Sequence, residues 1–303
     1  MLDKNFGSRL GISGYFFKGS DNAELFRTCQ ALGLSGIDLW PWNFEAQEIP
    51  KFSQKLKKSG LELVTFNIPG SVFRLGDALD SDIYSRVLKP LVDSSRELGC
   101  FELQMYCATP SVGEKEKGVN ELIDAISKLF EMLPDEMAIV LENNLDQRGD
   151  DPNRCNPSRS PDALYKVVSN FMSSRISLCF DPANFVAVGV DPLVAFNQIK
   201  NLISVVHVKD CIEFKPEEHR DRSEASFLFC DQNFGDFMPT IVGSGSLDWQ
   251  VLYREVNDHF KNVVNSPSLV IDPFIHVDLL DWWCIESVAA FRQIQAQVAE
   301  EPK

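Results

Sequence analysis

The chain has 303 residues, of which 44% are hydrophobic and 11% aromatic, which is enough apolar material for a large buried core. Its formal net charge is −15, and a surface this acidic repels phosphate backbones and anionic lipid headgroups. We therefore expect neither nucleic acid nor a membrane as a partner. No apolar run approaches the roughly 18 residues of a membrane helix, and residues 1–17 show no secretory signal pattern.

The eight cysteines are spread along the chain without a CxxC pair. Cys100, Cys107 and Cys179 stand beside or inside apolar runs. This distribution is typical of free thiols that are buried in a reducing compartment. We expect a cytoplasmic protein without a disulfide framework.

Short apolar runs alternate along the whole chain with longer stretches of helical spacing. The expected strands are Arg9–Ser13, Gly36–Leu39, Glu62–Asn67, Phe101–Tyr106, Ala138–Glu142, Ser177–Asp181, Ser204–Lys209 and Leu269–Asp272. The expected helices are Asn22–Leu32, Pro50–Ser59, Ser81–Leu98, Glu116–Leu133, Pro161–Phe171, Pro192–Asn201, Leu247–Phe260 and Leu279–Val298. Each strand is thus followed by one helix.

Start and stop signals support this division. Ser160 and Asp191 each place a capping side chain directly before a proline, and Gly60 and Gly99 stand where helices end. Eight strands alternating with eight helices predict a (β/α)8 TIM barrel, one domain over residues 1–303. The competing fold, an open doubly wound sheet, usually has fewer strands, and its glycine-rich dinucleotide fingerprint does not follow the first strand here.

Two of the strand-to-helix connections are long. Residues 143–160 follow the fifth expected strand, and residues 211–246 follow the seventh. In a barrel both lie on the carboxyl-terminal face, where active sites form. The second connection is rich in charged and aromatic residues, which suits either a lid or a subunit contact, so the sequence leaves open whether the chain forms a homo-oligomer.

Four side chains that can bind a metal stand at the ends of four consecutive expected strands. They are Glu142, Asp181, His207 and Asp272. Any one of them alone is as easily a loop cap or a buried core group. Because consecutive strands are neighbours around a barrel, we expect the four to converge. Two or three carboxylates with one imidazole suit Mn²⁺, Mg²⁺, Co²⁺ or Zn²⁺.

Three segments resemble successive signatures of the xylose-isomerase-like sugar isomerases and epimerases. They are Asp-Pro-Ala-Asn at 181–184, His-Val-Lys-Asp at 207–210 and the segment Gly-Ser-Gly-Ser-Leu-Asp-Trp at 243–249. Glu142 matches the glutamate that ends the fifth strand of that family. The resemblance covers nearly the whole chain. It implies one divalent metal ion, Mn²⁺ before Mg²⁺, Co²⁺ or Zn²⁺, bound by Glu142, Asp181, His207 and the eighth-strand carboxylate, Asp272.

The chain departs from the family pattern at three positions. The eighth-strand carboxylate is usually glutamate, and Asp272 is shorter by about 1.5 Å. Asn184 stands where the sixth-strand motif often has histidine. The epimerases hold their substrate with an arginine. In this chain the residue in its place is Lys209, or less plausibly Arg220. These departures leave the identity of the sugar open.

The resemblance implies a metal-dependent isomerase or epimerase of a ketose or related small-molecule sugar, acting through α-proton abstraction and an enediolate intermediate. Glu142 and Asp272 would remove and return the proton on the two faces of the carbon. Lys209 and Asn184 would hold hydroxyls. Trp40 and Tyr106 are further candidates for contact with the substrate, with ordinary packing as the alternative.

Two other functions remain open on the same fold. A lyase or dehydratase of a keto-sugar or inosose would use the same proton abstraction, followed by loss of a leaving group. A non-catalytic barrel subunit would need no metal. The apurinic-site endonucleases share the fold, but they use more histidines than the four present here, and the acidic charge is wrong for DNA.

Overall fold

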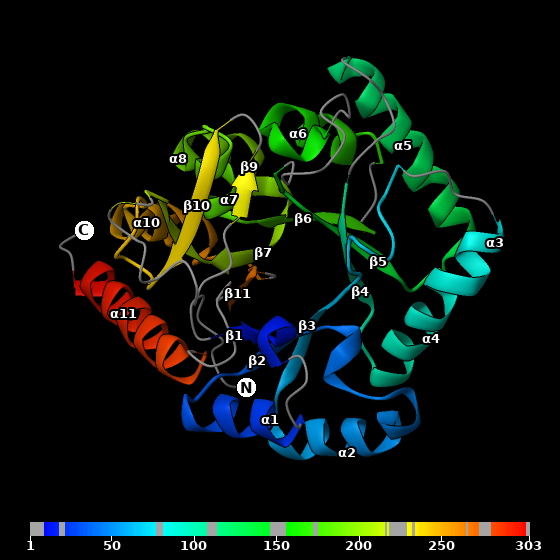
Figure 1. Ribbon diagram of the computed structural model, residues 1–303, viewed down its shortest axis with the longest axis horizontal. Coiled ribbons are helices and arrows are strands. Elements are labelled where there is room, and N and C mark those ends of the chain that lie inside the picture. Colours follow the sequence, from blue (N-terminus) through cyan, green and yellow to red (C-terminus); the bar gives the residue numbers. More distant parts are fainter. Residues whose placement is uncertain are drawn as a thin grey trace.

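The computed structural model describes residues 9–17, 22–76, 81–107, 114–145, 156–171, 175–215, 217, 229–231, 234–264, 266–272 and 280–300. Within them, eight parallel strands form a closed barrel in the order β1-β11-β7-β6-β5-β4-β3-β2. The helices surround this barrel on the outside, and the chain passes around the ring in sequence order (Figure 1).

The barrel strands are β1 (Leu10–Ser13), β2 (Gly36–Leu39), β3 (Glu62–Asn67), β4 (Glu102–Tyr106), β5 (Ala138–Glu142), β6 (Ile176–Phe180), β7 (Ile203–Val208) and β11 (Ser268–Ile271). The α-helices are α1 (Asn22–Ala31), α2 (Ile49–Ser59), α3 (Ser81–Ile83), α4 (Lys89–Leu98), α5 (Lys115–Met132), α6 (Pro161–Ser169), α7 (Pro182–Ala187), α8 (Pro192–Ile199), α10 (Trp249–Phe260) and α11 (Leu280–Glu300). The predicted (β/α)8 barrel is confirmed, and every barrel strand lies within one residue of its predicted bounds. None of the described helices combines the length and apolar character needed to cross a membrane.

The residues predicted to begin and end helices do so in the structure. The Ser160 hydroxyl accepts a hydrogen bond from the Ala163 amide, and the Asp191 carboxylate accepts from the first turn of α8. Gly60 and Gly99 end α2 and α4 with φ of 71° and 82°, the left-handed conformation that glycine adopts at least cost. These glycines therefore determine where α2 and α4 end and where the chain enters the next strand.

The helical layer differs from the prediction in two places. The expected helix Ser81–Leu98 is interrupted by a π-helical turn, Tyr84–Leu88, between α3 and α4. Helix α7 has no counterpart among the predicted helices, because its six residues are too few for a helical period to be recognised. Asp181 is consequently not the last residue of β6, as predicted, but the residue that caps α7.

Side chains on alternate strand positions fill the barrel in layers. Val140, Cys179, Val205 and Val270 come from the adjacent strands β5, β6, β7 and β11 and pack as one buried apolar cluster. The residue two positions further along each strand faces the same way. The layer above this apolar floor, towards the carboxyl ends, therefore holds the four side chains predicted to bind metal.

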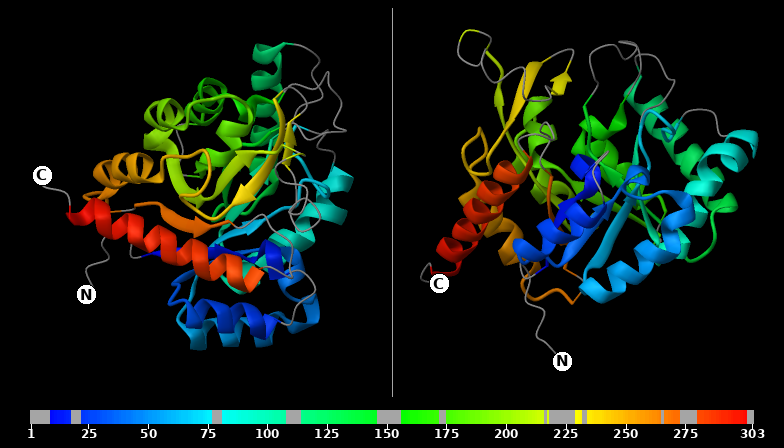
Figure 2. Two further views of the ribbon diagram at one scale, coloured as in Figure 1. Left: turned by 60° about the vertical axis from the view of Figure 1, so that its left-hand side comes forward. Right: turned by 60° about the horizontal axis from the view of Figure 1, so that its bottom comes forward.

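The connection at 211–246, predicted to be a loop, is partly a sheet. Strands β8 (Asp210–Glu213), β10 (Gly235–Thr240) and β9 (Phe229–Asp231) pair in the order β8-β10-β9, with β10 antiparallel to both neighbours. Figure 2 shows β10 and β9 projecting beyond one end of the barrel. Of the other long connection, 143–160, residues 146–155 lie outside the described part of the chain.

Asp210 ties this small sheet to the barrel. Its side chain is fully buried and accepts hydrogen bonds from the backbone amides of Cys211, Gly243, Gly245 and Leu247 at 2.8 to 3.3 Å. A methyl group on Gly245 would meet the Asp210 carboxylate at 2.1 Å. The aspartate at 210 and the glycine-rich segment at 243–249 are therefore one structural unit, although they are far apart in sequence.

We expect Asp210→Asn to lower the free energy of unfolding by about 2–4 kcal/mol. The new amide NH₂ group faces amide donors where a carboxylate oxygen accepted, and hydrogen bonds to a buried charge are worth about 1.5–3 kcal/mol each. Urea unfolding followed by circular dichroism measures the change. Asp135→Asn, at a fully exposed side chain, is the control, and equal stability of the two variants would contradict the assignment.

Candidate active site

The structure brings the four predicted metal ligands together above the apolar floor of the barrel. Glu142, Asp181 and His207 offer ligand atoms that all lie within 4.8 Å of one another. His207 Nδ1 is 3.3 Å from Glu142 Oε1 and 3.8 Å from both Asp181 Oδ2 and Asp272 Oδ2. All four side chains are buried, with exposed fractions of 0 to 7%.

The donor set fits a divalent cation. Neither ring nitrogen of His207 has a hydrogen-bond partner among the described residues, although the ring is buried among carboxylates. Burial lowers the pKa of His207, but its neighbours Cys179, Glu142, Asp181 and Asp38 raise it more, so that it stands well above the usual value. A proton thus takes the place that a cation would occupy, and two or three carboxylates with one imidazole suit a first-row divalent metal or Mg²⁺.

Amide side chains hold the Glu142 carboxylate and the backbone of Asp181. Gln104 Nε2 donates to Glu142 Oε2 at 2.9 Å, and Asn184 Nδ2 donates to Glu142 Oε1 at 3.3 Å. Asn143 forms two hydrogen bonds of 2.7 Å with the backbone of Asp181. The orientations of Glu142 and Asp181 are therefore fixed before any ligand binds.

Lys209 supplies a buried positive charge beside the carboxylates. Its Nζ donates to Asp181 Oδ2 at 3.0 Å and to Asn184 Oδ1 at 3.2 Å, and lies 3.6 Å from Asp272 Oδ2. Burial lowers the pKa of Lys209, but Asp181, Asp272 and Glu142 raise it above its usual value. Lys209 also helps to lower the pKa of Asp181 against the opposing effect of burial. Lys209 and Asn184, both predicted to contact substrate, thus lie in contact with the candidate metal ligands.

A fourth buried carboxylate, Asp38 of β2, was not among the predicted site residues. Its Oδ1 accepts from the Thr65 hydroxyl and, at 2.7 Å, from Asn67 Nδ2. Its Oδ2 lies 3.7 Å from His207 Nε2. Burial raises the pKa of Asp38 to about 6, against the opposing effect of His207.

Aromatic side chains border the site on the β1–β2 side. Trp40 and Trp42 stack with ring centroids 4.8 Å apart, and Tyr15 packs edge-on against both. The Trp40 indole donates to Ser13 Oγ at 3.2 Å, and its ring centroid is 6.5 Å from that of Tyr106. Tyr106 pairs with Glu142 in the register of β4 and β5, and burial and the charges of Glu142 and Asp272 raise the pKa of Tyr106 well above its usual value. Trp40 and Tyr106 are thus neighbours in one aromatic cluster at the rim of the site.

The residues that sequence reasoning missed share one signal. Asp38, Thr65, Asn67 and Gln104 are polar, yet each is fully buried within a barrel strand. A buried polar side chain in a strand needs a partner, and here the partners are one another and the candidate ligands. Arg220, named from the sequence as the less plausible alternative to Lys209, lies outside the described residues.

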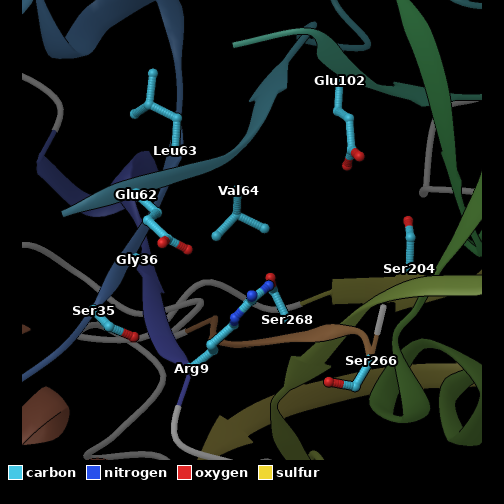
Figure 3. Close-up of a pocket in the computed structure, with 10 residues that line it drawn as sticks. All are labelled: Arg9, Ser35, Gly36, Glu62, Leu63, Val64, Glu102, Ser204, Ser266 and Ser268. Carbon is cyan, nitrogen blue, oxygen red and sulfur yellow. The ribbon is translucent and has the colours of Figure 1, made fainter. Parts of the chain in front are cut away.

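A cavity of about 360 Å³ lies at the amino-terminal end of the barrel strands, away from the candidate ligands, and its lining residues are drawn in Figure 3. Arg9, Glu62, Glu102 and Ser268 are among its lining residues, and the last three begin β3, β4 and β11. None of the candidate ligands lines it. The amino-terminal end of a (β/α)8 barrel serves stability, whereas chemistry takes place at the carboxyl-terminal end.

Comparison with known proteins agrees with this arrangement. A segment of 85 residues, 28% of the chain, is 34% identical to inosose dehydratase from Lacticaseibacillus casei, and the chain spans only 27% of the length of that relative. A D-tagatose 3-epimerase-like protein has a similar structure, with a TM-score of 0.69 and 13% identity over 96% of this chain and 98% of that one. The IolI protein, solved with a bound zinc atom, has a TM-score of 0.68 and 12% identity over 96% of this chain and 97% of that one.

The family model for the xylose isomerase-like TIM barrel matches residues 26–264, which include β2 to β7 and three of the four candidate ligands. The chain therefore belongs to the xylose isomerase-like TIM barrel family.

Proposed function

We propose that the protein is a metal-dependent isomerase or epimerase that removes the proton next to the carbonyl of a ketose or related small sugar. The observation that carries the proposal is the convergence of Glu142, Asp181 and His207 within 4.8 Å, with Asp272 beside them. The epimerase-like structural neighbour and the partial sequence match to inosose dehydratase support an enzymatic role, and the zinc bound to the IolI protein supports a metal site.

Glu142, Asp181 and His207, with Asp272 as a fourth donor, would hold one divalent cation. Such a cation acts as a Lewis acid that polarises a carbonyl oxygen and orients a neighbouring hydroxyl. The donor set accepts Mn²⁺, Mg²⁺, Co²⁺ or Zn²⁺. Lys209 Nζ lies 3.0 Å from Asp181 Oδ2 and 3.6 Å from Asp272 Oδ2, so one positive charge stands beside both of these proposed ligands.

Glu142 and Asp272 are the proposed bases. They come from the ends of β5 and β11, which are separated in the barrel by β6 and β7, and lie 3.3 and 3.8 Å from His207 Nδ1. A sugar carbon held between them would present one face to each. One carboxylate removes the proton and the other returns a proton to the opposite face, which inverts that carbon. Delivery instead to the neighbouring carbon moves the carbonyl along the chain, which is isomerisation.

The remaining polar and aromatic groups would position the sugar. Asn184 and Lys209 already form a hydrogen-bonded pair at 3.2 Å, and both can turn to sugar hydroxyls. The cluster of Tyr15, Trp40 and Trp42 supplies an apolar surface against which the ring carbons can pack. Tyr106 adds a phenol beside the two proposed bases.

Dehydration is the second candidate function. The 85-residue match to inosose dehydratase favours it, because that enzyme's name states loss of water from an inosose. The first step is the same proton abstraction by Glu142. The fate of the carbanion then differs, since the hydroxyl on the next carbon leaves as water instead of the proton returning.

We expect the purified protein to hold about one equivalent of a divalent metal, and Glu142→Ala and His207→Ala to lose it, because each substitution removes a ligand atom. Elemental analysis of protein prepared without chelator measures the content. Glu102→Ala, in the cavity at the other end of the barrel, is the matched control and keeps its metal. A parent protein that takes up no metal after supplementation would rule out both enzymatic functions.

Metal affinity should rise with pH across the neutral range. The pKa of His207 is raised, so at lower pH a proton occupies the nitrogen that the metal needs, and each displaced proton changes the affinity up to about tenfold per pH unit. Isothermal titration with Mn²⁺ at several pH values, in buffers of different ionisation enthalpy, counts the protons released. A pH-independent affinity would show that His207 is not a ligand.

We expect the metal-loaded protein to exchange the proton next to the carbonyl of its substrate with deuterated water. Ketoses and inososes are the panel to screen by mass spectrometry, and Glu142→Gln should slow exchange by about 10²–10⁴-fold. A product of unchanged mass apart from the deuterium identifies isomerisation or epimerisation. A product lighter by one water identifies the dehydratase. Full activity of Glu142→Gln would contradict its role as the base.

A further inference from the structure

His207 presents its two ring nitrogens to different surroundings. Nδ1 faces Glu142, Asp181 and Asp272 at 3.3 to 3.8 Å, which is the side of the candidate metal. Nε2 faces Asp38 Oδ2 at 3.7 Å. The ring therefore stands between the metal position and a carboxylate from a strand that supplies none of the four ligands.

The two carboxylate oxygens of Asp38 differ in their hydrogen bonding. Its Oδ1 accepts from Thr65 and from Asn67, whereas its Oδ2 has no hydrogen-bond partner among the described residues. His207 Nε2 likewise has none within that part of the chain. Both side chains are buried, with exposed fractions of 0 and 2%, and two buried polar atoms without partners cost free energy until they pair. Asp38 Oδ2, an acceptor, and His207 Nε2, a potential donor, thus face each other at 3.7 Å, slightly more than the length of a hydrogen bond.

We propose that Asp38 is the positioning residue of His207: its Oδ2 accepts the Nε2 proton, which fixes the tautomer and leaves the Nδ1 lone pair for the metal. The inference rests on the metal site proposed above. Metal-binding histidines commonly donate their second ring N–H to a carboxylate or carbonyl, which orients the ring and strengthens it as a ligand. Asp38 touches neither metal nor substrate in this arrangement and acts through His207.

The network behind Asp38 makes it suited to this role. The Asn67 amide and the Thr65 hydroxyl, both on β3, hold the carboxylate from the side away from the imidazole. Asn67 also donates to the Leu39 carbonyl at 3.3 Å, which ties β3 to β2. The carboxylate is consequently held at one place, so its position can dictate that of the ring.

Asp38→Asn is the variant that separates positioning from structure. Its amide oxygen can still accept from Thr65 and Asn67, but its NH₂ group then faces Nε2 and favours the tautomer with the proton on Nδ1. That tautomer has no lone pair for the metal. We expect the dissociation constant for Zn²⁺ to rise 10- to 100-fold, as is usual when such a partner is lost, while the thermal midpoint of the metal-free protein changes little.

The matched control is Ser204→Ala. Ser204 lies on the same strand as His207 and shares a hydrogen bond of 2.7 Å with Ser177, so its removal reports what the loss of one side-chain bond on β7 does by itself. We expect less than a threefold change in the Zn²⁺ dissociation constant. Equal affinity of Asp38→Asn and the parent protein would overturn the inference and leave the metal site intact.

A ¹⁵N spectrum of histidine in the Zn²⁺-loaded parent protein tests the tautomer directly and does not depend on the folding of a variant. We expect the His207 resonance, assigned with His207→Gln, to show zinc on Nδ1 and a proton on Nε2. Zinc on Nε2 would overturn the inference alone. A parent protein that binds no Zn²⁺, Mn²⁺ or Co²⁺ would overturn the proposed function, and the inference with it.

Discussion

Four carboxylates buried around one imidazole are the constraint on which the carboxyl-terminal end of this barrel depends. Asp38, Glu142, Asp181 and Asp272 cannot all carry charge in an interior of low dielectric constant without a compensating cation. Lys209 compensates only part of this charge. Burial, with the charges of Asp272 and Glu142, raises the pKa of Asp38 to about 6, and the neighbours of His207 raise its pKa well above the usual value despite burial. A divalent cation would replace the excess protons by charge that is fixed in place.

The barrel provides the packing and the hydrogen bonds that stabilise such a buried cluster of carboxylates. Strands β5, β6, β7 and β11 are neighbours, and the period of two along each strand sets an apolar layer below and a polar layer above. Val140 and its three neighbours exclude water from beneath the carboxylates. The side-chain amides of Gln104 and Asn184 donate to Glu142, and the backbone amide of Asn184 donates to the Asp181 carboxylate. The cluster is thus supported from below by an apolar layer and from the sides by hydrogen-bond donors.

The sequence predicts those parts of the molecule that depend on local pattern. Parallel strands buried on both faces are apolar runs, so all eight were predicted, and the four candidate ligands were found because each stands at the end of such a run. Asp38 and Gln104 were missed because a polar residue inside a strand does not reveal which strand will lie beside it. Strand β10 was missed because Gly235 begins it and Pro239 lies within it, and both residues argue against a strand in sequence. Its register with β8 depends on long-range contacts such as those of Asp210.

The two proposed bases are held very differently, and this asymmetry bears on what the site can do. Glu142 receives a hydrogen bond on each carboxylate oxygen, from Gln104 and from Asn184, so its direction is fixed. Asp272 is shorter than the glutamate typical of the family and has Lys209 as its nearest cation, at 3.6 Å. Lys209 is itself bound to Asp181 and Asn184, so any movement of Asp272 towards a substrate is coupled to the pair that surrounds the metal position. Under the proposed function, Glu142, held by two hydrogen bonds, and Asp272, with Lys209 beside it, suit a reaction whose first proton transfer is always made by Glu142. The second step then depends on whether Asp272 returns a proton or Lys209 stabilises a departing hydroxyl. Under the proposed function, the choice between epimerase and dehydratase would therefore depend on the contact between the Asp272 carboxylate and the Lys209 ammonium group.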